Sequence, residues 1–331
     1  MLITMIVSVI LFATCGKDEK YQREEGMVWN TLYHITYKSD KDMGDSIINV
    51  LNRVSKSLNV FDSTSIVGRL NRRGSLEVDN DFIMVYDASK RINGMSEGMF
   101  DPTVSPLVTA WGFGIGHKPT ADTLAIDSIL KYVGINKTER KGNIIIKEDV
   151  RTQFNFSAIA KGYGCDAVGE MFRSNGINDY MVEIGGEISL SGKNPQGGLW
   201  RISIDAPTEG NSEGRESAMI ISLTDQGIAT SGNYRNFRKD GNELRAHTIS
   251  PLTGRPYISK VLSATVVAET CMEADGFATA CMASEPEEAR NLLLRSGIEG
   301  LLILEDSVWM TPGFREFVIS ESSEPGRKGR N

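Results

Sequence analysis

The segment from 227 to 279 brings together small hydroxyl side chains, one histidine and one carboxylate, in the motifs GIATSGNYR, AHTISPLTGRP and EADGFATA. Thr230-Ser231-Gly232 predicts a turn that offers N–H groups and hydroxyls to phosphate oxygens, and His247 can move a proton near neutral pH. Asp275 and Thr279 share one face of a predicted helix over 273–283, and such hard oxygen ligands suit magnesium. The plain alternative is an ordinary helical Asp and a buried Thr.

Three earlier segments could complete a site for a phosphorylated ligand. In NFSAIAKGYGCD, Lys161 begins a helix predicted to run to Phe172, which favours anion binding. In VEIGGEISLSG, Gly185-Gly186 would let a ligand or another backbone approach closely. In GMFDPTVSPLVTAWGFG we expect a loop, where Trp111 and Phe113 offer a flat surface to a heteroaromatic ring. Taken singly, each segment is equally well explained as a tight hairpin or a buried loop.

Six motifs in this order resemble the ApbE family, the FAD:protein FMN transferases: GMFDPTVSPLVTAWGFG, AIAKGYGCD, VEIGGEISLSG, ATSGNYR, HTISPLTGRP and EADGFATA. The resemblance spans roughly residues 29–318. It implies an enzyme that cleaves the pyrophosphate of FAD with magnesium. The FMN half is then joined to a threonine or serine of a partner protein, and AMP is released.

The resemblance also assigns the metal site. It implies that Asp275, Thr279 and the main-chain oxygen of Ala158 hold Mg²⁺, while Ala278 stands where some relatives have a second acid. A site with a single carboxylate should hold the metal weakly without the phosphates of the substrate. We expect Asp275 to face solvent, as a ligand and not a core residue.

Flavin contacts and the base follow from the same resemblance. His247 is expected to deprotonate the acceptor hydroxyl, although it could instead only hydrogen-bond the flavin or the following turn. Four positions depart from the family wording: Trp29 replaces Met, Asn30 replaces Gly, Asn155 replaces the commoner Asp, and Phe61 replaces a tyrosine. The residues implied to bind the cofactor are Trp29, Phe61, Met99, Phe100, Asp101, Asn155, Lys161 and Ile249.

Three functions are compatible with these motifs. The first is the flavinyl transferase, whose acceptors would be flavin-carrying subunits of membrane redox complexes. The second is an FAD pyrophosphatase, in which water replaces the acceptor and FMN and AMP are released. The third is a non-catalytic flavin-binding lipoprotein of the periplasm. A base, His247, and a metal pair, Asp275 with Thr279, weigh against the carrier, which needs neither.

Composition narrows the partners. The chain has 331 residues, 40% hydrophobic and 24% charged, and a formal net charge of −7, so a nucleic-acid surface is not expected. Cys165, Cys271 and Cys281 are predicted to be small core residues. His34 and His117 belong to no motif, and we expect both at the surface.

The N-terminus predicts an anchor. MLITMIVSVILFATCGKDEKYQREEG is an apolar run, then a cysteine, then a charged stretch, and it resembles a bacterial lipoprotein signal that is lipidated at Cys15. A buried N-terminal strand is the alternative. The expected protein is therefore held on a membrane and faces the periplasm. We assign residues 1–20 to the signal and tether, 21–319 to a single flavin transferase domain, and 320–331 to a disordered tail.

The elements that must position these residues predict an α+β fold. Apolar residues at helical spacing occur over 47–58, 82–92 and 126–133, the last closed by Gly134. Alternating patterns predict strands over 33–37, 180–184, 188–190, 200–204 and 261–268. Helices and strands do not alternate one to one, which favours antiparallel sheets covered by helices. The resemblance further implies two related halves in one compact domain.

Overall fold

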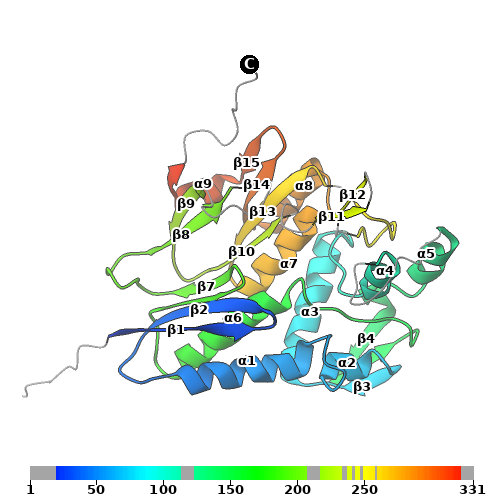
Figure 1. The fold of residues 1–331 in the computed structure, drawn as a ribbon, viewed down its shortest axis with the longest axis horizontal. Helices are drawn as coiled ribbons and strands as arrows, with labels where there is room; N and C mark the ends of the chain where they lie inside the picture. Colours follow the sequence, from blue (N-terminus) through cyan, green and yellow to red (C-terminus); the bar gives the residue numbers. More distant parts are fainter. Residues whose placement is uncertain are drawn as a thin grey trace, which may run out of the picture.

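The structure, a computed structural model, describes residues 20–112, 123–206, 217–232, 237–240, 243–246, 249–257 and 259–321 (Figure 1). Cys15, Phe113, His117 and His247 lie outside the described residues.

An eight-stranded sheet organises the molecule (Figure 1). Every pairing between its strands is antiparallel, as the sequence predicts. Its strands, in spatial order, are β1 (Tyr21–Val28), β2 (Thr31–Lys38), β6 (Tyr180–Ile184), β7 (Glu187–Ser191), β10 (Gly227–Gly232), β13 (Val261–Ala268), β14 (Glu299–Leu304) and β15 (Val308–Met310).

This sheet consists of two halves with the same connectivity. In the first half the hairpin β1–β2 is followed, after an insertion, by helix α6 (Ala160–Ser174) and the hairpin β6–β7. In the second half β10 and β13 are followed by helix α7 (Cys271–Met282) and, after α8, by the hairpin β14–β15. The halves meet where β7 pairs with β10, and the expectation of two related halves is confirmed in this topology.

The remaining helices mostly pack beside α6 and α7 on one face of the sheet or extend that layer sideways (Figure 1). They are α1 (Gly44–Leu58), α2 (Ile66–Leu70), α3 (Asn80–Met95), α4 (Ser105–Ala110), α5 (Thr123–Leu130), the short 3₁₀ turn η1 (Ile135–Lys137), α8 (Pro286–Ser296) and α9 (Pro312–Phe317).

Three small antiparallel sheets complete the described residues. The sheet β16–β9–β8 packs over the face of the main sheet that α6 and α7 leave open. The strands are β3 (Ser75–Glu77), β4 (Thr138–Lys141), β5 (Ile144–Lys147), β8 (Trp200–Asp205), β9 (Ser217–Leu223), β11 (Phe237–Asp240), β12 (Glu243–Ala246) and β16 (Val318–Glu321).

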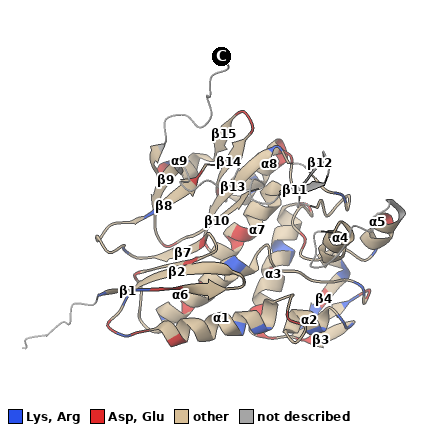
Figure 2. Ribbon diagram, in the orientation of Figure 1, with Lys and Arg blue, Asp and Glu red and all other residues tan. Residues whose placement is uncertain are grey.

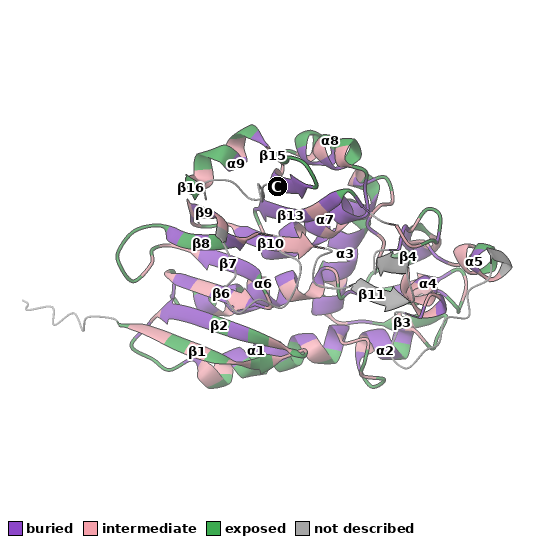
Figure 3. Cartoon of the chain, turned by 45° about the horizontal axis from the view of Figure 1, so that its top comes forward, coloured by how far each residue is buried: buried purple, intermediate pink, exposed green. Residues whose placement is uncertain are grey.

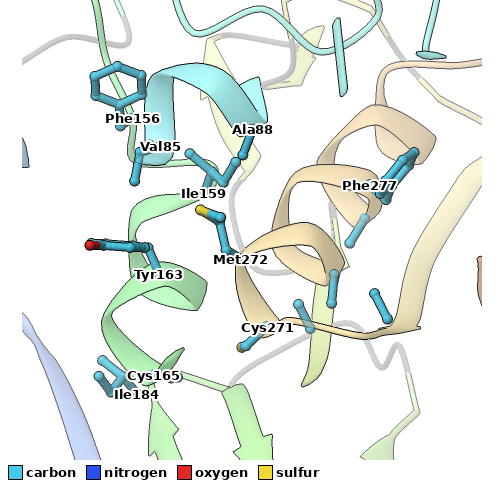
Figure 4. Close-up of a cluster of buried hydrophobic side chains, with 14 of the residues drawn as sticks. Val85, Ala88, Phe156, Ile159, Tyr163, Cys165, Ile184, Cys271, Met272 and Phe277 are labelled. Carbon is cyan, nitrogen blue, oxygen red and sulfur yellow. The ribbon is translucent and has the colours of Figure 1, made fainter. Parts of the chain in front are cut away.

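The largest core lies between the helices and the sheet, where buried residues dominate (Figure 3). Figure 4 shows Ala88 of α3, Ile159 just before α6 and Met272 of α7 converging at one point. Burial of this apolar surface holds the three helices together. Each Å² of apolar surface that is removed from water contributes about 25 cal/mol to the stability of the fold. Helices α6 and α7 therefore cannot shift independently of each other.

Most elements follow the sequence patterns, with four differences. The loop expected after Asp101 contains α4, which begins at Ser105 with Pro106 in its first turn. Thr230-Ser231-Gly232 is the end of strand β10 and not a turn, since all three residues pair with β13. Helix α5 ends at Leu130, before Gly134. Ser320 and Glu321, expected in a disordered tail, pair with β9 instead.

Smaller expectations are confirmed. Cys165, Cys271 and Cys281 are buried and free, and His34 is exposed. None of the described helices is both long and apolar enough to span a bilayer.

Candidate functional site

A half-buried lysine lies between two buried carboxylates where the two halves meet. Lys161, the second residue of α6, places its Nζ 2.6 Å from Oε1 of Glu187, the first residue of β7. The same Nζ lies 3.9 Å from Oδ2 of Asp275 in α7. Figure 2 shows basic and acidic segments meeting in this middle region, between α6 and α7. We call these three residues the charged cluster.

Burial controls the protonation of the charged cluster. Burial alone would lower the pKa of Lys161, but Asp275 and Glu187 outweigh it and raise that pKa, so the lysine is charged. Burial, and then the negative charge of Asp275, raise the pKa of Glu187, while Lys161 opposes the shift. Two carboxylates thus share one ammonium, and Oε2 of Glu187 is buried with no hydrogen-bond partner among the described residues.

A second set of oxygens lies one helical turn along α7. The Thr279 hydroxyl donates to the carbonyl oxygen of Ala158 over 3.4 Å, and Asp275 precedes Thr279 by one turn. The structure therefore brings the three predicted metal ligands together. Among the described residues, no group of three or more His, Cys, Asp or Glu side chains is placed to hold a metal, so any ion here would rely on these mixed oxygen ligands.

The expectation that Asp275 faces solvent is wrong, because this residue is only 2% exposed. Oδ2 of Asp275 accepts the Gly162 N–H over 3.2 Å, so the carboxylate lies against the first turn of α6. Burial raises its pKa, and Lys161 and the Gly162 N–H oppose that shift. Asp275 is consequently part of the packed core as well as a candidate ligand.

Glycine lets α6 and α7 approach this closely. A Cβ at Gly162 would lie 2.3 Å from the carbonyl oxygen of Cys271, which no side chain tolerates. Asp166, one turn further along α6, accepts the N–H groups of Cys271 over 3.0 Å and Met272 over 2.8 Å. The first turn of α7 is thus satisfied by a side chain of α6, which fixes where Asp275 lies.

A cavity of about 290 Å³ opens beside Ala158 and Thr279. Ser231 and Gly232, at the end of β10, also line it. Predicted cofactor-binding residues that line the same cavity are Met99, Phe100, Asp101, Asn155 and Ile249. The structure therefore gathers most of the predicted flavin site from three separate stretches of chain.

Asp101 holds the wall of this cavity. Its Oδ1 accepts the Thr103 hydroxyl over 2.6 Å and the Thr103 N–H over 2.8 Å, and its Oδ2 accepts the Ile135 N–H over 2.9 Å. Burial raises its pKa, and these hydrogen bonds oppose the shift. The carboxylate thereby ties the segment after α3 to the start of η1.

Three aromatic residues lie elsewhere. Phe61 is 69% exposed and does not line the cavity. Trp29 packs on α6, where a Cβ at Gly164 would lie 2.4 Å from its ring. Trp111 donates its Nε1–H to the carbonyl of Gly254 over 2.7 Å, which fastens the end of α4 to the turn after Ile249, and it does not line the cavity. His247, two residues before Ile249, lies outside the described residues.

Sequence reasoning missed two residues of the site. Glu187 stands inside the quoted motif VEIGGEISLSG, directly after the two glycines, but strand alternation alone gives no sign that it faces a lysine. Asp166 ends the motif AIAKGYGCD, and its partners are more than a hundred residues away in the chain. Two features of the sequence could have indicated them. Glu187 directly follows the Gly185-Gly186 pair, and Asp166 follows Lys161 by about one helical turn.

Comparison with known proteins places this geometry in a family context. A model of the ApbE family matches residues 29–302. An FAD:protein FMN transferase of Vibrio cholerae is 35% identical over 95% of this chain and 96% of its own length. One of Haemophilus influenzae is 32% identical, over 98% of this chain and 99% of its own.

Solved structures agree. The flavin transferase ApbE of Vibrio cholerae superposes with a TM-score of 0.81 at 33% identity, covering 90% of this chain and 99% of that one. The apo form of the flavinyl transferase ApbE of Pseudomonas stutzeri superposes with a TM-score of 0.80 at 26% identity, covering 91% and 99%.

Proposed function

The chain belongs to the ApbE family and is an FAD:protein FMN transferase, and we propose that it uses Mg²⁺ to move FMN from FAD to a threonine or serine hydroxyl of its acceptor. One observation carries the proposal. The cavity lined by the predicted flavin residues shares Ala158 and Thr279 with the oxygen set beside the charged cluster, so a ring in the cavity would place its phosphates there.

The residues present fit Mg²⁺. The Asp275 carboxylate, the Thr279 hydroxyl and the Ala158 carbonyl are hard oxygen donors, which Mg²⁺ prefers, and substrate phosphates can supply further ligands. When bound, Mg²⁺ would polarise a phosphoryl oxygen and neutralise charge that develops on it.

The chain's own groups would then direct the reaction. The acceptor oxygen forms a bond to the phosphorus of the FMN half, the bond from that phosphorus to the bridging oxygen breaks, and AMP leaves with that oxygen. Lys161 supplies a fixed positive charge beside the pyrophosphate, which favours the developing anion. Glu187 holds the lysine in place through the 2.6 Å contact.

We assign the acceptor proton to His247. Its motif AHTISPLTGRP also supplies Ile249, which lines the cavity and follows His247 by two positions in the sequence. A positioned base contributes about 10²- to 10⁴-fold in such a step.

The acceptors that we propose are flavin-carrying subunits of membrane redox complexes. Anchoring through a lipid on Cys15 would hold the enzyme on the periplasmic side of a membrane, close to them. The apolar run before Cys15 and the charged stretch after it support this placement.

Two variants test the assignment when FAD affinity and AMP release are measured separately. His247→Ala should keep the FAD affinity of the parent and lose turnover by about 10²-fold or more. Asp275→Asn should lose Mg²⁺-dependent AMP release. Equal losses of affinity and rate in His247→Ala would make it a binding residue. Full turnover in Asp275→Asn would mean that the metal site lies elsewhere.

A further inference from the structure

A second cavity, of about 410 Å³, lies on the other face of the main sheet, between that sheet and β8. Its walls include Leu32 of β2, the Gly185-Gly186 turn, Ile188 of β7, and Ile228 and Thr230 of β10. We call this cavity the seam groove, because it lies where the two halves of the sheet meet. None of the predicted flavin residues lines it.

Strand β10 contributes residues both to the seam groove and to the cavity of about 290 Å³ described above, which we call the flavin cavity. Thr230 lines the seam groove, while the next two residues of β10, Ser231 and Gly232, line the flavin cavity. Residues in a strand are about 3.3 Å apart, so a group beside Thr230 is within one or two residues of the flavin cavity. The charged cluster is also close in sequence to this junction, since Glu187 begins β7 and directly precedes Ile188, which lines the seam groove.

Part of the β10 edge that faces β7 has no strand partner among the described residues. It pairs with β13 over all six residues, but among the described residues it pairs with β7 only at Gly227 and Ile228. Gln226 accepts the Leu190 N–H over 3.0 Å, and backbone groups alternate along a strand, so the N–H and C=O of Thr230 face the same edge as those of Ile228. An extended peptide could pair there, as strand addition does elsewhere.

The walls of the seam groove are preformed and mixed, with isoleucines of β7, β8 and β10 beside polar residues that include His34 and Glu183. Glu183 accepts the Gly186 N–H at Oε1 over 2.7 Å and contacts His34 Nδ1 at Oε2 over 2.5 Å, so the glycine turn is held in place. At its mouth, Leu32 is 55% exposed, and Met27, its cross-strand partner on the same face, is 70% exposed. Two large exposed apolar side chains beside an open strand edge are typical of a docking surface.

We propose that the seam groove receives the acceptor protein as an extended segment, which pairs with the Thr230 edge of β10 and delivers its hydroxyl residue to the flavin cavity. The proposal rests on the proposed function. Leu32, Ile188 and Ile228 form an apolar part of the lining, which calls for an apolar acceptor side chain within about four residues of the hydroxyl residue, given the rise along a strand. No folded acceptor surface is required, because backbone pairing supplies affinity and the pocket supplies specificity.

A peptide library tests this with a matched pair of variants. The probe is a set of peptides of about twelve residues, each with one central threonine and with serine and threonine excluded elsewhere, long enough to cross the groove. Leu32→Glu places a charge at the mouth, whereas Leu294→Glu makes the same change at a 54% exposed position on α8. Covalent flavin on the peptides, FAD affinity and AMP release are measured for each protein.

The parent and Leu294→Glu should label peptides that carry an apolar residue near the threonine. Leu32→Glu should label them at about one tenth of the parent rate or below, since an apolar contact is lost. AMP release should fall in the same proportion, because each transfer releases one AMP, while FAD affinity stays unchanged. Equal labelling by Leu32→Glu, labelling without preference, or AMP release without any peptide labelling would each overturn the groove. Absence of FAD binding and AMP release in the parent would instead refute the proposed function.

A second copy of the chain is the competing occupant. Light scattering of the parent and Leu32→Glu identifies it: a dimer that becomes a monomer in Leu32→Glu, with peptide labelling intact, would make the seam groove a self-association surface and overturn the proposal.

Discussion

At the scale of single residues, Lys161 determines the charge balance of the site. Its ammonium contacts Glu187 and approaches Asp275, so removing it leaves two buried carboxylates facing each other. An unpaired buried charge costs several kcal/mol, so the lysine compensates a large part of the cost of burying these carboxylates. The cluster was only partly predictable: the lysine stands out at a helix start, but its carboxylate partners come from distant elements.

We predict that Lys161→Ala weakens FAD binding by about 10- to 100-fold, because a charge-assisted contact to phosphate contributes about 1.5–3 kcal/mol. Fluorescence titration of FAD measures it. Lys90→Ala serves as the control, since Lys90 contacts the carbonyl of Thr138, away from the charged cluster. Identical affinities in Lys161→Ala and the parent would remove the lysine from the pyrophosphate site.

At the scale of elements, α6 positions α7. The Asp166 carboxylate accepts the first two N–H groups of α7, and Gly162 allows the close crossing that places Asp275. Burial raises the pKa of Asp166 to about 6, although these two N–H groups oppose the shift. The helix that carries the candidate metal ligands therefore depends on a titratable group of its neighbour.

This gives a pH prediction. Between pH 4 and about 6 the native state retains the Asp166 proton that the unfolded chain, with an ordinary carboxyl pKa near 3.8, has lost. The native state binds more protons there, so the free energy of unfolding falls as pH rises through that window. Denaturant titrations should show this decline diminished in Asp166→Asn, by at most about 1.4 kcal/mol per pH unit. Asp45→Asn, at an exposed position on α1, should leave it unchanged. The same decline in Asp166→Asn as in the parent would contradict the assignment.

The sequence predicts elements better than their junctions. Helices α1, α3 and α6 follow their apolar periodicity closely, because one face of each is buried. Strand β13 and helix α7 are buried on nearly all sides, and their apolar and small residues predict them instead. Thr230 to Gly232 was expected as a turn, since flanking glycines suggest one, yet pairing with β13 keeps the segment extended. Asp275 was expected in solvent, because periodicity cannot show that Gly162 brings a second helix against it.

At the scale of the whole molecule, the proposed site lies where two similar halves of one sheet join. Lys161 and Glu187 come from the first half and Asp275 from the second, so the charged cluster exists only when both halves pack together. The seam between β7 and β10 is paired over only two positions, which leaves space on both faces of the sheet. In our proposal the two halves together form one cavity that binds the flavin and one groove that binds a peptide.

Anchoring is also a property of the whole molecule. We predict that the chain, expressed in a bacterium with a functional translation start, fractionates with membranes, and that Cys15→Ser is recovered without lipid. One acyl chain alone binds membranes only marginally, whereas several hold firmly, so the contrast should be large. Mass spectrometry of the N-terminal peptide identifies the modification. Recovery of the parent wholly in the soluble fraction would count against the anchor.

We propose that the region around Asp275 and Lys161 cleaves FAD with Mg²⁺ and passes FMN to a hydroxyl of the acceptor protein. The most direct measurement incubates the chain with FAD, Mg²⁺ and a purified flavin-acceptor subunit, then quantifies AMP and covalent flavin on the denatured acceptor. We predict AMP and acceptor-bound FMN in equal amounts for the parent, and neither in the presence of a chelator or with Asp275→Asn. Undiminished labelling with the chelator or with Asp275→Asn, or AMP matched by free FMN with no labelled acceptor, would contradict the claim.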